Sequence, residues 1–314
     1  NIILRIYLIV CIMFFKVSIF RIMYYNIKKI KQMIKEIRLK NFKIHKNFNL
    51  IIKNKISLIY GDNSIGKTSL LDAVNLFNAQ NKITNIEEFV NNDSKNFEIN
   101  IKSLYDYTFK FNQTKSIQIN EVNKKSINLL NYIQIFYLHP YNMQMFWKDI
   151  SMRRKMFDKI ISQNNLSFLK AISTYNKVLK QRNKLIEENQ FNEYWRFSLD
   201  SLIKENGKII NSYRKEKINM FNLLSREREL NINITLSPTF EEQEEIFNSN
   251  LSSNFLGIHK TKINITKNDN QLSNAQAHKI FINLISMSFD TNINDKILLL
   301  DDVFAYLDTS SVEF

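Results

Sequence analysis

Hydrophobic and polar positions alternate over short distances in the first half of the chain, a pattern typical of strands. Alternating runs occur at residues 34–41 and 48–52, and an apolar run at residues 56–60 follows them. Further strand-like runs lie at residues 97–104, 107–111, 116–119 and 131–138. The last run ends at His139-Pro140, where proline closes it. The pattern predicts a β-rich region up to about residue 138.

The middle of the chain has helical periodicity instead. Between residues 151 and 230 there is no proline and a single glycine, Gly207. Apolar residues recur there at helical spacing, at Phe157, Ile160, Ile161, Phe168, Ile172 and Leu179. Residues 297–300 then form an apolar run typical of a buried strand. Strand signals on both sides of a helical region predict an α/β head with an inserted, mainly helical lobe.

The first 32 residues do not fit this scheme. Residues 2–25 are rich in Ile, Leu, Phe, Tyr and Met, but Arg5, Lys16 and Arg21 interrupt them. A membrane span needs about twenty mostly apolar residues, and each central charge costs a few kcal/mol. The stretch also lacks a small-residue site for signal cleavage. We interpret residues 1–32 as sequence upstream of a native start at Met33, with a poor membrane anchor as the alternative.

Composition and charge narrow the functional classes. The 314 residues contain 44 Lys and Arg against 30 Asp and Glu, a net charge of +14. Such an excess favours a polyanionic partner, although Lys, Asn and Ile are raised together, which is also what compositional drift of the coding DNA produces. The single cysteine, Cys11, excludes an intrachain disulfide and a cysteine-based zinc site. The four histidines show no ligand-like spacing, and a reducing, cytoplasmic setting is the simplest fit.

The strand-like run at residues 56–60 leads into a phosphate-loop motif. The motif G-x-x-x-x-G-K-[ST] is matched by Gly61, Asp62, Asn63, Ser64, Ile65, Gly66, Lys67 and Thr68. In such a loop the backbone N–H groups and the helix dipole attract phosphates. Lys67 would then lie on the β- and γ-phosphates, and the Thr68 hydroxyl on Mg²⁺. The alternative is an ordinary strand-to-helix turn with a surface lysine.

Two aspartates follow the apolar run near the end of the chain. Asp301 and Asp302 come directly after residues 297–300, at the carboxyl end of the expected strand. Ligands of open parallel sheets bind at that end. In a phosphate-loop enzyme Asp301 would hold the Mg²⁺ shell, and Asp302 would orient or deprotonate the attacking water. The sequence therefore predicts an ATP and Mg²⁺ site made by Lys67, Asp301 and Asp302.

A serine upstream of these acids is a further candidate. Ser273 lies 28 residues before Asp301, at the start of a run with helical periodicity. With Gln276 it also fits a capping box, and the two interpretations are compatible because a helix N-terminus bearing a serine is a phosphate site. In the ABC arrangement such a serine serves the nucleotide of a second subunit, so the active unit would be a homodimer.

Together these blocks resemble the RecF family of SMC-like ABC ATPases, from Met33 to about Asp308. Residues 33–42 look like the family's opening, and residues 67–73 look like its phosphate-loop helix. Residues 153–158 (RRKMFD) are similar to its R-R-x-F-L-D segment, and residues 175–183 (YNKVLKQRN) give the most distinctive match. Residues 257–260, Leu272-Ser273, residues 299–303 and Leu307-Asp308 complete the order.

The resemblance implies an ATP-dependent DNA-binding protein of recombinational gap repair, replication and the SOS response to DNA damage. Such proteins bind gapped or junction DNA, dimerise on ATP, hydrolyse it slowly and, with RecR, help load RecA. The resemblance also places Ser69 and Asp308 at the nucleotide. It makes Arg153, Arg154, Lys180 and Arg182 candidates for head or DNA contacts, with a solvated helix face as the alternative. The corresponding domains are a head at residues 33–138, a helical lobe at 139–250, and an incomplete second head segment at 251–314.

Several positions depart from the family pattern. Ser64 replaces a glycine, which is costly if that backbone has a positive φ. Asn274 and Ala275 stand in place of the signature glycines, and the chain stops at Phe314, before the final strands of the head. A sheet lacking an end strand would expose an edge. These departures leave open a decayed relative that binds nucleotide or DNA without an ATPase cycle. A membrane-attached ABC ATPase is a third hypothesis that rests only on residues 1–32.

Overall fold

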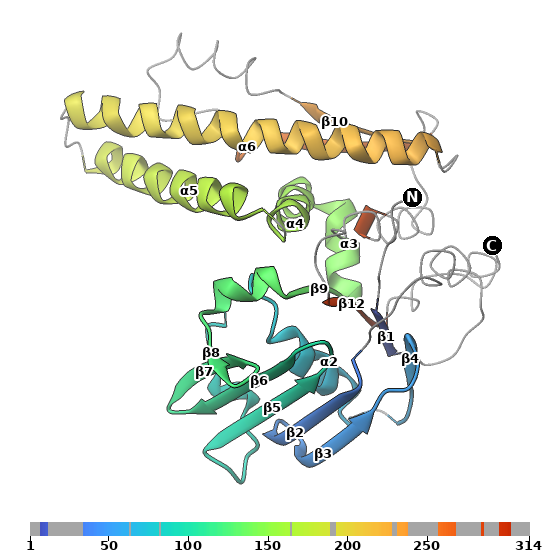
Figure 1. Cartoon of the computed structure of the whole chain (residues 1–314). Coiled ribbons are helices and arrows are strands. Elements are labelled where there is room, and N and C mark those ends of the chain that lie inside the picture. Colours follow the sequence, from blue (N-terminus) through green and yellow to red (C-terminus); the bar gives the residue numbers. More distant parts are fainter. Residues whose placement is uncertain are drawn as a thin grey trace. The chain divides into compact units, whose positions relative to one another are not determined.

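The chain forms two compact units, Asn1–Gln144 with Asn274–Phe314, and Met145–Ser273 (Figure 1). The structure is a computed structural model that describes residues 7–11, 34–62, 64–81, 83–163, 165–188, 193–227, 231–237, 257–267, 284–285 and 295–302. None of the helices in these ranges has the length and apolar content needed to cross a membrane.

A parallel sheet of four strands carries the first unit's sequence motifs. Its order is β4 (Ile56–Ile59), β1 (Tyr7–Cys11), β12 (Asp295–Asp301) and β9 (Ile133–Leu138), and each neighbouring pair is parallel. Every residue of β12 is buried, and β9 is buried except at Tyr137. Near-continuous apolar runs such as these are characteristic of strands covered on both faces, as the sequence predicted for residues 297–300.

The strand β1 comes from residues 1–32, which we interpreted as sequence upstream of the native start. In the structure its residues 7–11 (YLIVC) occupy an inner position in the parallel sheet, and the start at Met33 stays a prediction. Leu8 pairs with Ile56 on one side and Leu298 on the other. A short apolar run fits a strand as well as a membrane anchor, and here its backbone hydrogen-bonds to two neighbouring strands.

A six-stranded antiparallel sheet completes the first unit. Its order is β3 (His45–Ile51), β2 (Glu36–Phe42), β5 (Asn96–Lys102), β6 (Asp106–Asn112), β7 (Thr114–Ile119) and β8 (Val122–Asn123). Buried and exposed positions alternate along β5 and β6, so one face of the sheet packs inward. On that face Phe97 and Phe109 stack with ring centroids 5.8 Å apart, and Phe77, after helix α2 (Lys67–Asn75), packs edge-on against Phe109.

Asp295 ties the two sheets of this unit together. This residue begins β12 and accepts hydrogen bonds from the Ser103 hydroxyl (2.6 Å) and the Tyr107 hydroxyl (2.7 Å) of the antiparallel sheet. Burial raises the pKa of the Asp295 carboxyl, and these two hydrogen bonds oppose that shift. The start of the acid-bearing strand is therefore fixed by specific polar contacts.

Helices make up most of the second unit. Two short 3₁₀ helices, η1 (Glu87–Phe89) and η2 (Ser126–Asn131), lie in the first unit, and α3 (Pro140–Lys148) leads from it into the second. The second unit then contains α4 (Ile150–Ser162), α5 (Leu166–Glu187), α6 (Glu193–Glu227) and the antiparallel pair β10 (Ile232–Ser237) and β11 (Lys262–Lys267). The sequence had assigned residues 262–267 to the second head segment, but their pairing with β10 places them with the helices.

Side-chain contacts hold α5 and α6 side by side as an antiparallel pair (Figure 1). The Arg182 guanidinium pairs with Asp200 at 2.6 Å, and further along Phe168 packs edge-on against Tyr213. The buried side of α5 consists of Phe168, Ala171, Tyr175, Val178 and Arg182, which recur at helical spacing. Asn165 caps this helix by accepting a hydrogen bond from the backbone N–H of Phe168.

Candidate nucleotide-binding site

The phosphate-loop motif follows β4 and has the backbone conformation of a tight turn. Gly61 has φ 154°, and Gly66, the residue before α2, has φ 99°. A positive φ at these positions explains why glycine stands there. Gly66 has no side chain to cap the helix, so the first N–H groups of α2 face the turn without a capping group. Such a helix start suits an anion.

Lys67 lies within this turn. Its ammonium donates hydrogen bonds to the carbonyl oxygens of Gly61 (2.8 Å) and Asp62 (2.7 Å). Thr68 is exposed and Ser69 is half-buried at the start of α2. The structure thus places the cation, a hydroxyl and the helix start together, as the motif predicts. Asn63 lies outside the described residues.

Ser64 has a positive φ, the backbone conformation in which a side chain is costly. Its φ is 67°, in the left-handed region where a side chain costs about 1 kcal/mol or more. The turn therefore forms in spite of this residue. The expected strain at Ser64 is present in the structure.

Residues at the β2–β3 turn contact the phosphate loop and the helix that follows it, and sequence reasoning missed them. His45 Nε2 donates to the Gly66 carbonyl oxygen at 3.2 Å, and the Lys43 ammonium lies 2.6 Å from an Asp72 carboxylate oxygen on α2. Asn91 in turn donates to the Lys43 carbonyl oxygen, so the turn is held from its other side. The spacing between residues 45 and 66 gave no signal, because this contact comes from the pairing of strands.

The two acids lie at the same edge of the sheet as the phosphate loop. Asp301 ends β12 and is 3% exposed, and its carboxylate accepts a hydrogen bond from the Tyr137 hydroxyl at 3.0 Å. Cys11 of β1 pairs with Asp301 on one side and with Ile59, two residues before Gly61, on the other. Two strand spacings, about 10 Å, therefore separate the end of β4 from Asp301. Asp302 follows at an exposed position with φ 46°.

The chemistry of these groups suits triphosphate and magnesium. Hydroxyl and carboxylate oxygens, as on Thr68 and Asp301, are the ligands that Mg²⁺ accepts, usually together with phosphate oxygens and water. Within the described ranges no group of three or more His, Cys, Asp or Glu side chains could hold a metal ion by itself. Ser273 and Asp308, the other expected nucleotide contacts, lie outside the described residues.

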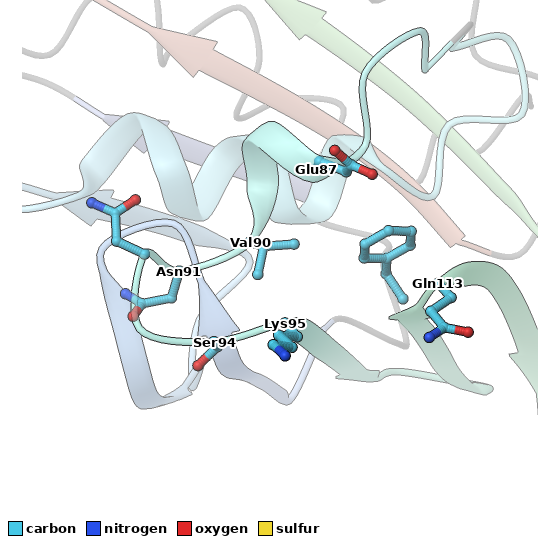
Figure 2. Close-up of a pocket in the computed structure, with 8 residues that line it drawn as sticks. Glu87, Val90, Asn91, Ser94, Lys95 and Gln113 are labelled. Carbon is cyan, nitrogen blue, oxygen red and sulfur yellow. The ribbon is translucent and has the colours of Figure 1, made fainter.

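A separate pocket of about 390 Å³ lies in the first unit on the segment after η1 (Figure 2). Its lining includes Glu87, Asn91, Lys95, Phe111 and Gln113. None of the lining residues belongs to the phosphate loop or to the acid pair. The pocket is therefore distinct from the candidate nucleotide site.

Comparisons with known proteins agree over nearly the whole chain. The DNA replication and repair protein RecF of Lachnospira eligens is 28% identical over 321 residues, which cover 90% of this chain and 88% of that protein. RecF of Clostridioides difficile is 26% identical over 88% of this chain and 85% of its own length. Over most of its length the chain is similar to proteins named RecF. No protein-family model matches it.

Solved structures of RecF share the fold of this chain. A structure of the recombination mediator protein RecF with ATP, from the RecFOR pathway, matches 90% of this chain and 88% of that chain with a TM-score of 0.70 and 22% identity. A second structure of RecF from that pathway, with an ATP analogue, gives a TM-score of 0.69 over 88% of this chain and 87% of that chain, at 22% identity. The chain therefore has the fold of these RecF structures, an α/β head with an inserted, mainly helical lobe.

The first two candidate DNA contacts, Arg153 and Arg154, have partners within the helical unit. The Arg153 guanidinium donates to the carbonyl oxygens of Phe146, Trp147 and Ile263 at 2.9–3.0 Å. Arg154 donates to the Thr261 carbonyl oxygen at 3.0 Å. Burial lowers the pKa of both guanidiniums. Arg153 thereby satisfies carbonyls at the end of α3 and joins that end to β11.

The other two candidates differ from each other. Arg182 is 2% exposed and paired with Asp200, so its guanidinium faces the α5–α6 interface, where DNA has no access. Lys180 is exposed on the opposite side of α5. Of the four cations, Lys180 alone has the exposure that a DNA contact needs.

A buried polar cluster explains why the family-like segments of this unit come together. Arg214, 2% exposed on α6, makes two hydrogen bonds with the Asp158 carboxylate (2.8 and 2.7 Å) and donates to the Ile258 carbonyl oxygen. The Tyr175 hydroxyl lies 3.1 Å from His259 Nδ1. Burial raises the pKa of Tyr175, and burial, helped by nearby cations, lowers the pKa of His259 to about 4. His259 is therefore neutral at physiological pH.

Proposed function

We propose that this chain is an ATP-dependent DNA-binding protein of recombinational gap repair and replication. The observation that carries the proposal is the placement of the phosphate loop and the Asp301–Asp302 pair at one edge of one parallel sheet. Ligands of such sheets bind at the carboxyl ends of the strands. The matches to proteins named RecF, and to RecF structures with ATP, support the same function.

Each group at this edge has a task in the proposed site. The first N–H groups of α2 and the Lys67 ammonium bind the triphosphate, and Lys67 exchanges its two carbonyl acceptors for phosphate oxygens. Thr68 and Asp301 would hold Mg²⁺, which supplies charge stabilisation to the phosphates when bound. The exposed carboxylate of Asp302 orients or deprotonates the attacking water. Tyr137 fixes the Asp301 carboxylate through its hydroxyl.

The partners follow from the relatives. We propose binding to gapped or junction DNA, cooperation with RecR in loading RecA, and a homodimer that forms on ATP and uses Ser273. The net charge of +14 supports a nucleic-acid partner. The second candidate function is a nucleotide-binding or DNA-binding relative without an ATPase cycle, which the left-handed conformation of Ser64 favours.

Titration with a fluorescent ATP analogue and Mg²⁺ tests the nucleotide site. Lys67→Ala is expected to weaken binding at least tenfold, because it removes a charge-assisted contact to phosphate. Lys53→Ala is the matched control, since it removes the same charge from an exposed position before β4. Equal affinity of the two variants would contradict the proposed site.

Hydrolysis separates the two candidate functions. Asp302→Asn is expected to retain ATP binding and to lower DNA-stimulated hydrolysis by about a hundredfold or more, as for loss of a general base. Size measurements with ATP and Mg²⁺ test the dimer. If the wild-type chain binds ATP but shows neither hydrolysis nor ATP-dependent dimerisation, the second candidate function replaces the first.

A further inference from the structure

The exposed side of helix α5 carries only one sign of charge over most of its length. Lys170, Lys177, Lys180 and Lys184 are all exposed, and we call them the α5 lysine face. They are spaced seven, three and four residues apart, which places them along one side of the helix. No Asp or Glu occurs on α5 before Glu187. Neutral polar residues, including Ser173 and Gln181, occupy the exposed positions between the lysines.

The buried side of α5 makes this face a rigid one. Phe168, Tyr175 and Arg182 lie on the opposite side and anchor the helix through Tyr213, His259 and Asp200. The Arg182–Asp200 pair is nearly excluded from water, with the arginine side chain 3% exposed. The cations of the buried side therefore stabilise the unit, and the lysines of the outer side are left facing solvent.

Helix α6 shows that this charge segregation is not a general property of the helical unit. Its exposed positions mix Lys208 with Glu205 and Glu216. An alternating pattern of this kind is typical of a solvated helix face. No carboxylate stands between the lysines of the α5 lysine face, and among the described residues its one ion pair is near its end, where Lys184 lies 3.5 Å from Glu188.

We propose that the α5 lysine face binds the phosphate backbone of double-stranded DNA. The inference rests on the proposed function and names the surface that takes its DNA. From Lys170 to Lys184 the face extends about 21 Å along a straight helix. A duplex carries about twelve phosphates over that length, so four lysines can each meet one. Lysine contacts to phosphate position a duplex without reading its sequence.

Salt-dependent binding to a fluorescent 30-base-pair duplex tests the proposal with the full chain. The test variant is Lys170→Gln, Lys177→Gln and Lys180→Gln combined. Loss of three phosphate contacts should reduce the slope of log affinity against log salt by about 2.7 and weaken binding more than tenfold at 50 mM salt. The control, Lys204→Gln, Lys208→Gln and Lys215→Gln on α6, makes the same change in net charge and should stay within about threefold of wild type.

Three outcomes would overturn the proposal. The first is an α5 variant whose slope of log affinity against log salt equals that of the wild type. The second is an α6 control that loses as much affinity for the duplex as the α5 variant does. The third is an α5 variant that loses binding to anionic phosphatidylserine vesicles but not to the duplex. Circular dichroism and thermal unfolding check that both variants fold. ATP binding is measured in parallel. If neither the wild type nor the two variants bind ATP, the proposed function is contradicted. The salt slopes still show in that case whether the α5 lysine face binds DNA.

Discussion

Lys67 in the first unit and Arg214 in the second are both cations held by main-chain carbonyl oxygens, but only one of them remains available to a ligand. Lys67 is held by Gly61 and Asp62 of its own loop, beside exposed Thr68. Arg214 is enclosed, with a bidentate carboxylate and a carbonyl from two other segments. The difference lies in the acceptors: a phosphate can replace two carbonyls at the surface, whereas nothing outside the protein can replace Asp158.

The comparison extends to the family-like segments around these residues. Residues 153–158 carry more positive charge than residues 61–68, yet Arg153 and Arg154 donate hydrogen bonds to carbonyl oxygens of their own unit. Removing the Lys67 side chain should therefore weaken nucleotide binding, whereas removing a buried arginine side chain should lower the stability of the fold.

The largest effect is expected from Arg214→Ala. The substitution leaves the Asp158 carboxylate without its bidentate partner, and breaking a buried pair in this way costs about 3–5 kcal/mol of unfolding free energy. Urea unfolding measures the change. Arg226→Ala, at an exposed position near the end of the same helix, is the control and should change stability by less than about 0.5 kcal/mol. Similar losses in both variants would remove the distinction between the two kinds of cation.

Gly66→Ala should damage the loop with less effect on stability. A Cβ at this position would lie 2.5 Å from His45 Nε2, and the φ of 99° strains any other residue. Strain of about 2 kcal/mol in the binding conformation corresponds to a loss of roughly thirtyfold in ATP affinity. His45→Ala combined with Gly66→Ala removes the contact with His45 but leaves both the backbone strain and the Ile44 Cδ1 atom 2.6 Å from the new Cβ, so it should restore only part of the affinity. Full ATP affinity in Gly66→Ala would show that the loop does not bind phosphate in this conformation.

Acidification should weaken the buried cluster of the second unit. The pKa of His259 is about 4 in the fold against 6.5 without it, so the neutral form is the one that the folded state favours. Its contribution is fully present above pH 6.5 and is lost as the pH falls towards 4. Because the ring is partly exposed, we expect a loss of about 1 kcal/mol. Urea unfolding at pH 7.5 and pH 5 should show a smaller difference for His259→Gln than for wild type, and an equal difference would contradict this role.

The smallest effect is expected from Ser64→Gly. Glycine adopts φ 67° without the cost of a side chain, so the folded state should gain about 0.5–1 kcal/mol after the larger entropy of the unfolded chain is counted. Thermal unfolding and ATP titration measure the change. A loss of ATP affinity would mean that the Ser64 side chain itself contacts the nucleotide.

Local patterns allowed much of the first unit to be predicted. The loop at residues 61–68, the strand before it and the buried strand before Asp301 each have a signal within a few neighbouring residues. The strand β1 had no such signal, because a short apolar run flanked by Arg5 and Lys16 fits several environments equally well. Its assignment depends on pairing with residues 56–59 and 297–301, which are distant in sequence.

Burial of polar groups was also beyond sequence reasoning. The sequence made three arginines candidates for DNA contacts: Arg153, Arg154 and Arg182. Their guanidiniums instead contact Ile263, Thr261 and Asp200, as the structure shows. The contact of His45 with Gly66 was missed for the same reason. In each case a residue's role was set by a partner from another element, and spacing along one element gave no information about it.

The place of β1 also governs the order in which this protein can be completed during synthesis. Tyr7 pairs with Ile297, so β1 has both of its neighbouring strands only after a segment far along the chain has left the ribosome. Contacts between such distant residues form slowly, because the intervening chain must first be brought into order. A nascent chain therefore contains the phosphate loop long before Asp301 and Asp302 have been synthesised. During that interval β1 lacks its partner β12, and chaperones can bind the unpaired strand.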